Sequence, residues 1–459
     1  MAKAKSKKIT IEDALVPVDE QPYEVPENWC WTRVKMLGKE FFDGDWILGE
    51  NMDPNGKVRL LQLSDIGIGE FLDKSDKHIS ENTFEKLGCT ALHQGDVMIS
   101  RMAEPIARSC IVPEFDYPVI TAVDVAVLRC REELVDNRYL NYLCNAKWFT
   151  DVAMSLARGT TRTRITRNNL GDMAVPLPPL PEQQRIVEQI ERLFSKLDEA
   201  KEKAQEALDS FEERRVAILH KAFEGELTLQ WRAEHGVDMS SWRDVPLKDC
   251  GRWFGGGTPT TSKKEYWEGG DIPWITSKDM KDRIIEDSLM HITMTGVENS
   301  SANYCEEPAI LFVMRSGILR RVFPVCMVKR PFTVNQDLKA CVPDGILQEY
   351  LFWYCTGFEK DIRDNCMKSG TTVESVEAKK LFDYSIRVAG ADEQKEIVNR
   401  IEAMLDKEAA AYEAAEEVIE NIEVVKKSVL ARAFRGELGT NDSSEESSIE
   451  LLKQIIANE

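Results

Sequence analysis

The chain has 459 residues, of which 43% are hydrophobic and 30% are charged. This composition is typical of a folded protein, and the length is enough for about two to four domains. No segment reaches the roughly 20 consecutive apolar residues of a membrane-spanning helix, and the basic first residues lack the apolar core of a signal peptide. We therefore expect a cytoplasmic protein without a membrane partner.

The cysteines and histidines give no sign of a metal site. The eleven cysteines are scattered without a CxxC pair, and the five histidines form no HExxH or HxxxH pair. Short spacings of that kind are what a zinc site requires. We expect the cysteines to be small buried side chains or free thiols, and we expect no metal in this chain.

The net charge of −20 argues at first against a nucleic-acid partner, because contacts to phosphates need cations. However, 13 of the 20 excess negative charges lie in residues 182–227, in residues 391–438 and in the tail from residue 440. The remaining segments are closer to neutral. They can carry local basic surfaces, so a nucleic-acid partner is not excluded.

Residues 1–24 predict an N-terminal extension, and residues 25–180 predict a first globular domain. Short apolar runs indicate strands, and a helical stretch follows them, so the domain should be α+β. The loop after that stretch, ARGTTRTRITRNN, is rich in side chains that bond phosphate oxygens and base edges. A merely solvated basic loop is the alternative. The DNA contacts predicted in this domain are Arg101, Arg158, Thr160, Thr161, Arg162, Arg164 and Arg167.

Residues 181–228 predict a long helix that begins after the proline-rich segment PLPPLPEQ. Apolar residues recur along it at spacings of three and four, which is typical of a coiled-coil seam, and Gly225 stands where a helix cap is expected. The predicted seam residues are Ile186, Ile190, Leu193, Leu197 and Phe211. A dimerisation coil without a measuring role is the alternative.

Residues 229–390 predict a second α+β domain. Its loop KSGTTVESVEAKK corresponds to the arginine-rich loop and keeps the Gly-Thr-Thr, but it loses most of the arginines, so its specificity should differ. Other cations of this domain form a cluster that could contact a groove, although each alone could be an ordinary surface charge. The predicted contacts are Lys278, Arg315, Arg320, Arg321, Lys329, Lys368, Thr371 and Thr372.

Residues 391–438 predict a second helix that repeats the first at an offset of 211. EQQRIVEQIERLF pairs with EQKEIVNRIEAML and KAFEGEL pairs with RAFRGEL, and about 18 of 46 aligned positions are identical. The offset carries the seam to Ile401, Met404, Val418, Ile422 and Val425. Duplicated units that bury equivalent faces tend toward a two-fold axis, which predicts antiparallel helices with a domain at each end. Residues 439–459 predict an acidic tail.

Catalytic motifs do not appear in the sequence. There is no GxxxxGK[ST] phosphate loop, no glycine-rich dinucleotide fingerprint and no Asn/Asp-Pro-Pro-aromatic methyltransferase signature. We therefore expect this chain to do no chemistry by itself.

The order of these motifs resembles the specificity subunit of type I restriction-modification systems, and the resemblance covers nearly the whole chain. VPENW and SSWRDVPL are similar to that family's domain openings, whereas RVAGADEQ departs from its proline-rich approach to the second helix. The resemblance implies two target recognition domains that read the halves of a split, asymmetric site in double-stranded DNA, with the helices fixing the spacer. It also implies two modification subunits, which use S-adenosylmethionine to methylate adenine, and restriction subunits that use ATP and Mg. A coiled-coil adaptor that binds proteins is the remaining alternative.

Overall fold

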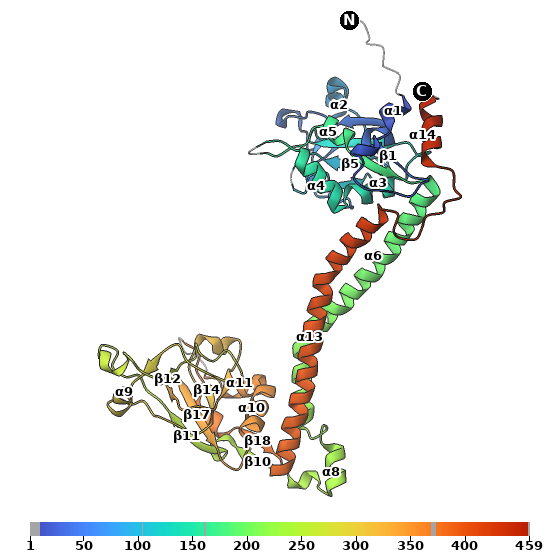
Figure 1. Cartoon of the computed structure of the whole chain (residues 1–459). Coiled ribbons are helices and arrows are strands. Elements are labelled where there is room, and N and C mark those ends of the chain that lie inside the picture. Colours follow the sequence, from blue (N-terminus) through green and yellow to red (C-terminus); the bar gives the residue numbers. More distant parts are fainter. Residues whose placement is uncertain (1–9, 103, 160–161, 369–372, 458–459) are drawn as a thin grey trace. The chain divides into compact units, whose positions relative to one another are not determined.

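The computed structural model describes residues 10–102, 104–159, 162–368 and 373–457 (Figure 1). The chain divides into two compact units. The first consists of residues 1–204 and 417–459, and the second of residues 205–416. Among the described residues, none of the helices has the length and apolar character needed to cross a membrane.

The first unit is built on three small sheets. The largest is antiparallel, with the order β2-β8-β5-β6, and the others are β4-β3-β7 and β1-β9. Strands β5 and β8 are buried almost throughout, which places the core against this sheet. The bounds are β1 Cys30–Arg33, β2 Gly38–Asp43, β3 Val58–Leu61, β4 His78–Ile79, β5 Val97–Ser100, β6 Ser109–Ile111, β7 Val119–Thr121, β8 Val125–Cys130 and β9 Ala174–Leu177.

Short helices cover this core. The Asp136 side chain caps the start of α3 by accepting from the backbone amides of Arg138 and Tyr139, and the Thr166 hydroxyl caps α5 in the same way. The C-terminal helix α14 packs on the same core through Leu452 and Ile456. The bounds are α1 Ile11–Ala14, α2 Glu81–Leu87, α3 Asn137–Cys144, α4 Lys147–Leu156, α5 Arg167–Asp172 and α14 Ser448–Ala457.

The second unit repeats this topology strand for strand. Its sheets have the orders β11-β17-β14-β15, β13-β12-β16 and β10-β18, which correspond one by one to those of the first unit. The strands are β10 Arg243–Pro246, β11 Gly251–Gly255, β12 Ile272–Ile275, β13 His291–Ile292, β14 Ala309–Val313, β15 Val325–Val328, β16 Thr333–Val334, β17 Leu338–Pro343 and β18 Ser385–Val388. The helices are α8 Leu229–His235, α9 Met294–Glu298, α10 Gln348–Gly357, α11 Glu359–Cys366 and α12 Ala378–Asp383. The predicted α+β duplication is therefore confirmed.

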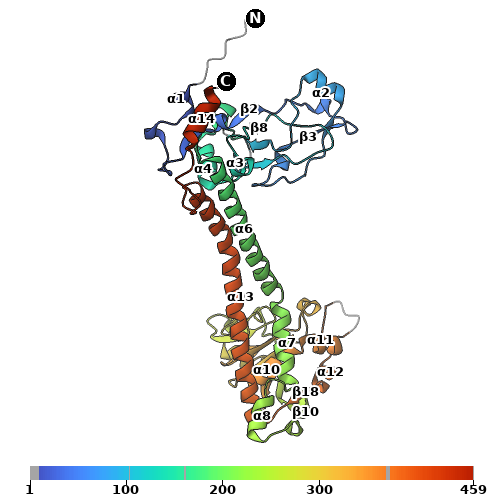
Figure 2. The same cartoon turned by 90° about the vertical axis from the view of Figure 1, so that its right-hand side faces the viewer.

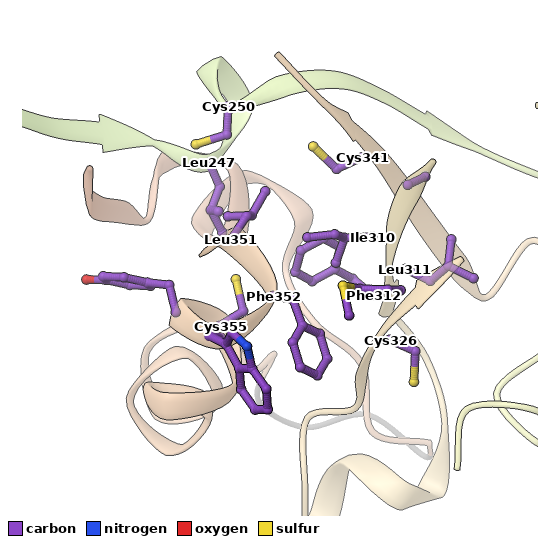
Figure 3. Packing of buried hydrophobic residues seen from close by; sticks show 14 of the residues in the cluster. Leu247, Cys250, Ile310, Leu311, Phe312, Cys326, Cys341, Leu351, Phe352 and Cys355 are labelled. Carbon is purple, nitrogen blue, oxygen red and sulfur yellow. The ribbon is translucent and has the colours of Figure 1, made fainter. Parts of the chain in front are cut away.

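Cysteines help to fill these cores. Figure 3 shows Cys250, Cys341 and Cys355 packed among Leu247, Leu351 and Phe312 in the second unit. All eleven cysteines lie in the described part of the chain as free thiols, and ten of them are buried. The interpretation of the cysteines as small apolar side chains is thus confirmed for all but the half-buried Cys89.

The long helices are α6 Leu180–Asp209, α7 Phe211–Phe223 and α13 Ala391–Ala433. In the first unit, Asp198 pairs with Lys426 at 2.5 Å and Lys201 pairs with Glu423 at 3.6 Å. From the first pair to the second, the residue number rises on α6 and falls on α13, so the two helices are antiparallel. Figure 2 shows them side by side. In the second unit, the rings of Phe211 and Tyr412 lie 4.7 Å apart. The predicted antiparallel pairing is confirmed.

The first long helix is not continuous, contrary to the prediction. It is interrupted at Ser210, whose hydroxyl donates to the carbonyl of Glu206 at 2.7 Å. A serine that bonds its own helix backbone in this way competes with the regular ladder and often bends the helix. Glycines follow the ends of α7 and α13 as expected, because Gly225 and Gly436 adopt φ of +85° and +74°, where a side chain would be strained.

The buried face of α13 differs from the predicted seam. Ile401 and Ile422 are buried, but Met404, Val418 and Val425 are 36%, 41% and 41% exposed, so the predicted seam is wrong at these three positions. At each of these three positions the next residue along the helix is the half-buried one. The buried and half-buried residues of this face are Leu405, Glu408, Tyr412, Ala415, Ile419, Ile422 and Lys426. Two of them are charged, and their long side chains bury apolar stems while the charged ends find partners. In α6 and α7, Ile186 and Ile190 are buried, and Leu193, Leu197 and Phe211 are half-buried.

Candidate nucleic-acid interface

The arginine-rich loop of the first domain begins and ends at two residues whose backbones are hydrogen-bonded to each other. The backbone amides of Arg158 and Arg164 each donate to the other's carbonyl at 2.9 Å, and the amide of Ile165 donates to the carbonyl of Arg101 at 2.9 Å. Arg158 and Arg164, at the base of the loop, therefore lie beside the end of β5. Thr160 and Thr161 lie outside the described residues.

Two aspartates organise the arginines around this base. Asp43, at the end of β2, lies 3.1 Å from Nε of Arg101 and 3.8 Å from Nη1 of Arg167. Asp124 lies 3.3 Å from Nη2 of Arg164, which also donates to the carbonyl of Val123 at 3.1 Å. Burial lowers the pKa of Arg101, and the charge of Asp43 opposes that shift.

The structure corrects the role predicted for Arg101. Its side chain is only 6% exposed, and Nη2 donates inward to the carbonyl of Val123 at 2.5 Å. Arg101 therefore braces the loop from inside and does not present its guanidinium to a ligand. Arg158 and Arg162 are exposed, and Arg164 and Arg167 are half-exposed. These four cations exceed the two aspartates, which leaves a local positive charge suited to phosphate.

The corresponding loop of the second domain is less basic. The backbone amide of Lys368 donates to the carbonyl of Ser375 at 2.9 Å, and Arg315 bridges to the same serine, so Arg315 and Lys368 stand together and are exposed. Arg320 joins them, because its Nε lies 2.5 Å from the carboxylate of Glu374 and lowers the pKa of that group. Thr371 and Thr372 fall outside the described residues.

The other predicted contacts of the second domain are Lys278, Arg321 and Lys329. Lys329 pairs with Glu349 at the start of α10, at 2.6 Å. Lys278 is exposed in the turn after β12, and Arg321 is exposed beside Arg320. The described contacts connect neither Lys278 nor Lys329 with the loop, so a single cationic cluster that includes them stays a prediction.

Each unit also contains a buried carboxylate that joins three distant segments. In the first unit, Glu182 accepts from the indole Nε1 of Trp29 at 3.0 Å and from the hydroxyl of Thr440 at 3.3 Å. The core beside it receives Phe434 of the RAFRGEL motif. Burial raises the pKa of Glu182, and the two hydrogen bonds oppose that shift.

The same arrangement recurs in the second unit around Glu393. Its carboxylate accepts from Nε1 of Trp242 at 2.8 Å and from the hydroxyl of Thr228 at 2.7 Å, and it pairs with the buried Arg232 at 2.6 Å. Phe223 of KAFEGEL lies in the adjoining core. We call Glu182 with its two partners, and Glu393 with its three, the carboxylate clamps. They fasten each domain opening to one helix start and to the end of the other helix.

Sequence reasoning missed the aspartates and the clamps. Nothing local distinguishes Asp43 or Asp124 among 79 acidic residues, because their arginine partners come from distant strands and loops. The clamps did leave a signal. A tryptophan lies near the start of each domain, and a Glu-Gln pair lies at the start of each long helix. Because both features occur in both repeats, the sequence indicates that they have the same role in each.

Comparisons with known proteins agree with this architecture. The family model described as type I restriction modification DNA specificity domain matches residues 39–208 and 239–421. The specificity subunit of the type I restriction enzyme EcoR124I/EcoR124II from Escherichia coli is 28% identical over 295 residues, which are 62% of this chain and 67% of that protein. The MjaIX specificity subunit from Methanocaldococcus jannaschii is 32% identical over 171 residues, but these are 35% of this chain and 37% of that protein.

Solved structures share the fold. The HsdS subunit from Thermoanaerobacter tengcongensis superposes with a TM-score of 0.67 at 22% identity, covering 92% of this chain and all of that one. A chain from a structure of a type I R-M system, solved for its complex assembly and conformational transition, gives a TM-score of 0.58 at 22% identity. Because the family model matches both repeats, this chain belongs to the DNA specificity subunits of type I restriction-modification systems.

Proposed function

We propose that the two domains read the two halves of a bipartite, asymmetric DNA site, so that the chain directs adenine methylation and restriction by its partners. The observation that carries this proposal is that the two domains share one topology but differ in their exposed loops. The first presents Arg158 and Arg162, whereas the second presents Lys368 and an Arg320–Glu374 pair. Two domains that share a fold but present different loop side chains are suited to recognise two different half-sites.

The long helices support a role in setting the distance between the half-sites. Helix α13 has 43 residues, which at 1.5 Å per residue corresponds to about 65 Å. That length exceeds one turn of DNA, about 34–36 Å, so a spacer of unread base pairs fits the proposal. Shortening α6 and α13 by matched heptads should change the permitted spacer or abolish binding, and an unaltered spacer would contradict this role.

The partners of the proposed complex are two modification subunits and a set of restriction subunits. Methylation of adenine uses S-adenosylmethionine, and translocation and cleavage use ATP and Mg, all of which in such systems belong to those partners. The exposed faces of α6 and α13, together with α14, are the proposed docking surfaces for the modification subunits.

The proposal is tested with the chain assembled with its methyltransferase partner. Methylated adenines in host DNA, mapped by single-molecule sequencing, should all fall within one bipartite motif. Replacing Arg158, Arg162 and Arg164 by Ala should weaken recognition of one half-site only. The control replaces Lys57, Lys86 and Lys147, which are exposed on other elements of the same domain. Equal affinity of the wild-type complex for all duplexes would refute the proposal, and loss of preference at both half-sites would refute two independent readers.

A further inference from the structure

Trp46 is an unusually exposed aromatic residue. All ten tryptophans lie in the described part of the chain, and Trp46, at 67% exposed, is the one that faces mainly solvent. Leu48, two residues later, is 46% exposed, so this segment presents two large apolar side chains to solvent, as a surface that binds a ligand does.

The backbone around Trp46 is firmly held. The amide of Gly44 donates to the carbonyl of Val125 at 2.9 Å, and the amide of Asp45 donates to the carbonyl of Thr121 at 2.8 Å. On the other side, Ile47 packs on the small core formed by Val58, Leu60, Ile79 and Ile120. Neighbouring side chains of an extended segment point to opposite faces, so the burial of Ile47 turns Trp46 outward.

Trp46 stands beside the arginine site of the first domain. Asp43, three residues earlier, pairs with Arg101 and Arg167. Asp45 bridges to Ala122, and the next residue, Val123, carries the carbonyl to which Arg101 and Arg164 donate. The Trp46 segment therefore adjoins the half-exposed Arg164 and Arg167, and their charge favours a polyanion over an apolar protein surface.

The second domain has an equivalent position with different chemistry. In the β2–β8 pair Asp43 stands opposite Ala126, and in the corresponding β11–β17 pair Gly255 stands opposite Lys339. Trp46 follows Asp43 by three residues, as Thr258 follows Gly255, so these two positions correspond. Val123 precedes Ala126 by three residues, as Gln336 precedes Lys339, so these two correspond as well. The Thr258 hydroxyl donates to Oε1 of Gln336 at 2.6 Å, and both residues are exposed. This bond makes the two positions neighbours in the second domain. In the first domain the aligned residues are both apolar, so a hydroxyl and an amide in one domain correspond to a tryptophan and a valine in the other.

We propose that this position contacts bases of the duplex in both domains, through the Trp46 ring in the first and through the Thr258–Gln336 pair in the second. The inference rests on the proposed function. In a duplex, an aromatic ring covers a thymine methyl group or inserts between base steps, whereas an amide bonds an adenine or another base edge directly. The carbonyl oxygen of Gln336 has a second lone pair and its nitrogen carries two N–H groups, so the bond from Thr258 leaves capacity for a base.

The test uses the chain assembled with its methyltransferase partner and duplexes that carry single base changes in either half-site. Trp46→Ala should weaken binding by about tenfold to a hundredfold and alter preference in the first half-site only. The dependence of affinity on salt should stay that of the wild type, because the ring neutralises no phosphate. Gln336→Ala should lower discrimination at one base pair of the second half-site by about tenfold.

Trp46→Phe should retain most of the affinity, and Leu229→Ala, at an equally exposed apolar residue on α8, serves as the control. Wild-type affinity and base preference in both Trp46→Ala and Gln336→Ala would overturn the inference. So would a Trp46→Ala complex that assembles poorly with the methyltransferase but binds DNA normally once assembled. In either case a sequence-selective wild-type complex would leave the proposed function intact, whereas a wild-type complex without sequence preference would refute the proposed function itself.

Discussion

Removing Arg232 tests how strongly the second carboxylate clamp holds its domain. The guanidinium is buried beside the carboxylate of Glu393, and it also donates from Nη2 to the carbonyl of Gly225 at 2.7 Å. Arg232→Met keeps most of the apolar stem but leaves a buried carboxylate without its cation, a change that typically costs about 3–5 kcal/mol. Because Thr228 and Trp242 still donate to Glu393, we expect the lower end, about 3 kcal/mol.

Thermal unfolding at neutral pH measures this loss of stability. At about 2–4 °C per kcal/mol for a unit of this size, the variant should melt roughly 6–12 °C lower at neutral pH. Arg232→Met combined with Glu393→Gln should recover at least half of the loss, since no buried charge remains. Arg215→Met removes an exposed pair with Glu212 and should cost below about 1 kcal/mol. The reasoning would be refuted if Arg232→Met lost no more stability than Arg215→Met. It would also be refuted if the loss in the double variant equalled the sum of the losses in Arg232→Met and Glu393→Gln alone.

Three further predictions concern the first unit. Arg162→Ala should weaken DNA binding and reduce the slope of log affinity against log salt by about 1, and an unchanged slope in a salt titration would show that Arg162 meets no phosphate. Because its pKa is raised, Glu182 makes the unit lose stability as the pH rises through that pKa, so Glu182→Gln should flatten this dependence in urea titrations, and an unaltered profile would contradict it. Truncation after Asn441 removes the buried Leu452 and Ile456, a loss of about 3–6 kcal/mol, and should speed hydrogen exchange in β1 and β9; protection at the wild-type level would show that α14 does not stabilise them.

The helical framework could be predicted because its signals are local and occur twice. The Glu-Gln starts and the Phe-x-Gly-Glu-Leu ends bound each helix, and the offset of 211 relates them. The register of the buried face on α13 could not be predicted from apolar residues alone. Glu408 and Lys426 occupy seam positions because Arg214 and Asp198 stand opposite them, and such pairing is invisible until both helices are in place.

The candidate site was predicted less well than the frame. The arginine-rich loop was recognisable as a run of residues, but the separate tasks of its members depend on aspartates from other elements. Arg101 turns inward because Asp43, 58 residues earlier, meets it at the end of β2. Trp46 gave no signal, since one tryptophan among ten is distinguished only by its exposure.

The carboxylate clamps also set the order in which a growing chain can complete its two domains. The second clamp needs Thr228, Trp242 and Glu393, so it is complete once Glu393 has been made, directly after the strands and helices of its own domain. The first needs Trp29 and Glu182 early but waits for Thr440, and Tyr23 waits for the carbonyl of Phe434, which it reaches at 3.0 Å. The clamp of the domain that is synthesised first is thus the last to be completed. During translation its tryptophan and its glutamate stay without their third partner until Thr440 has been made.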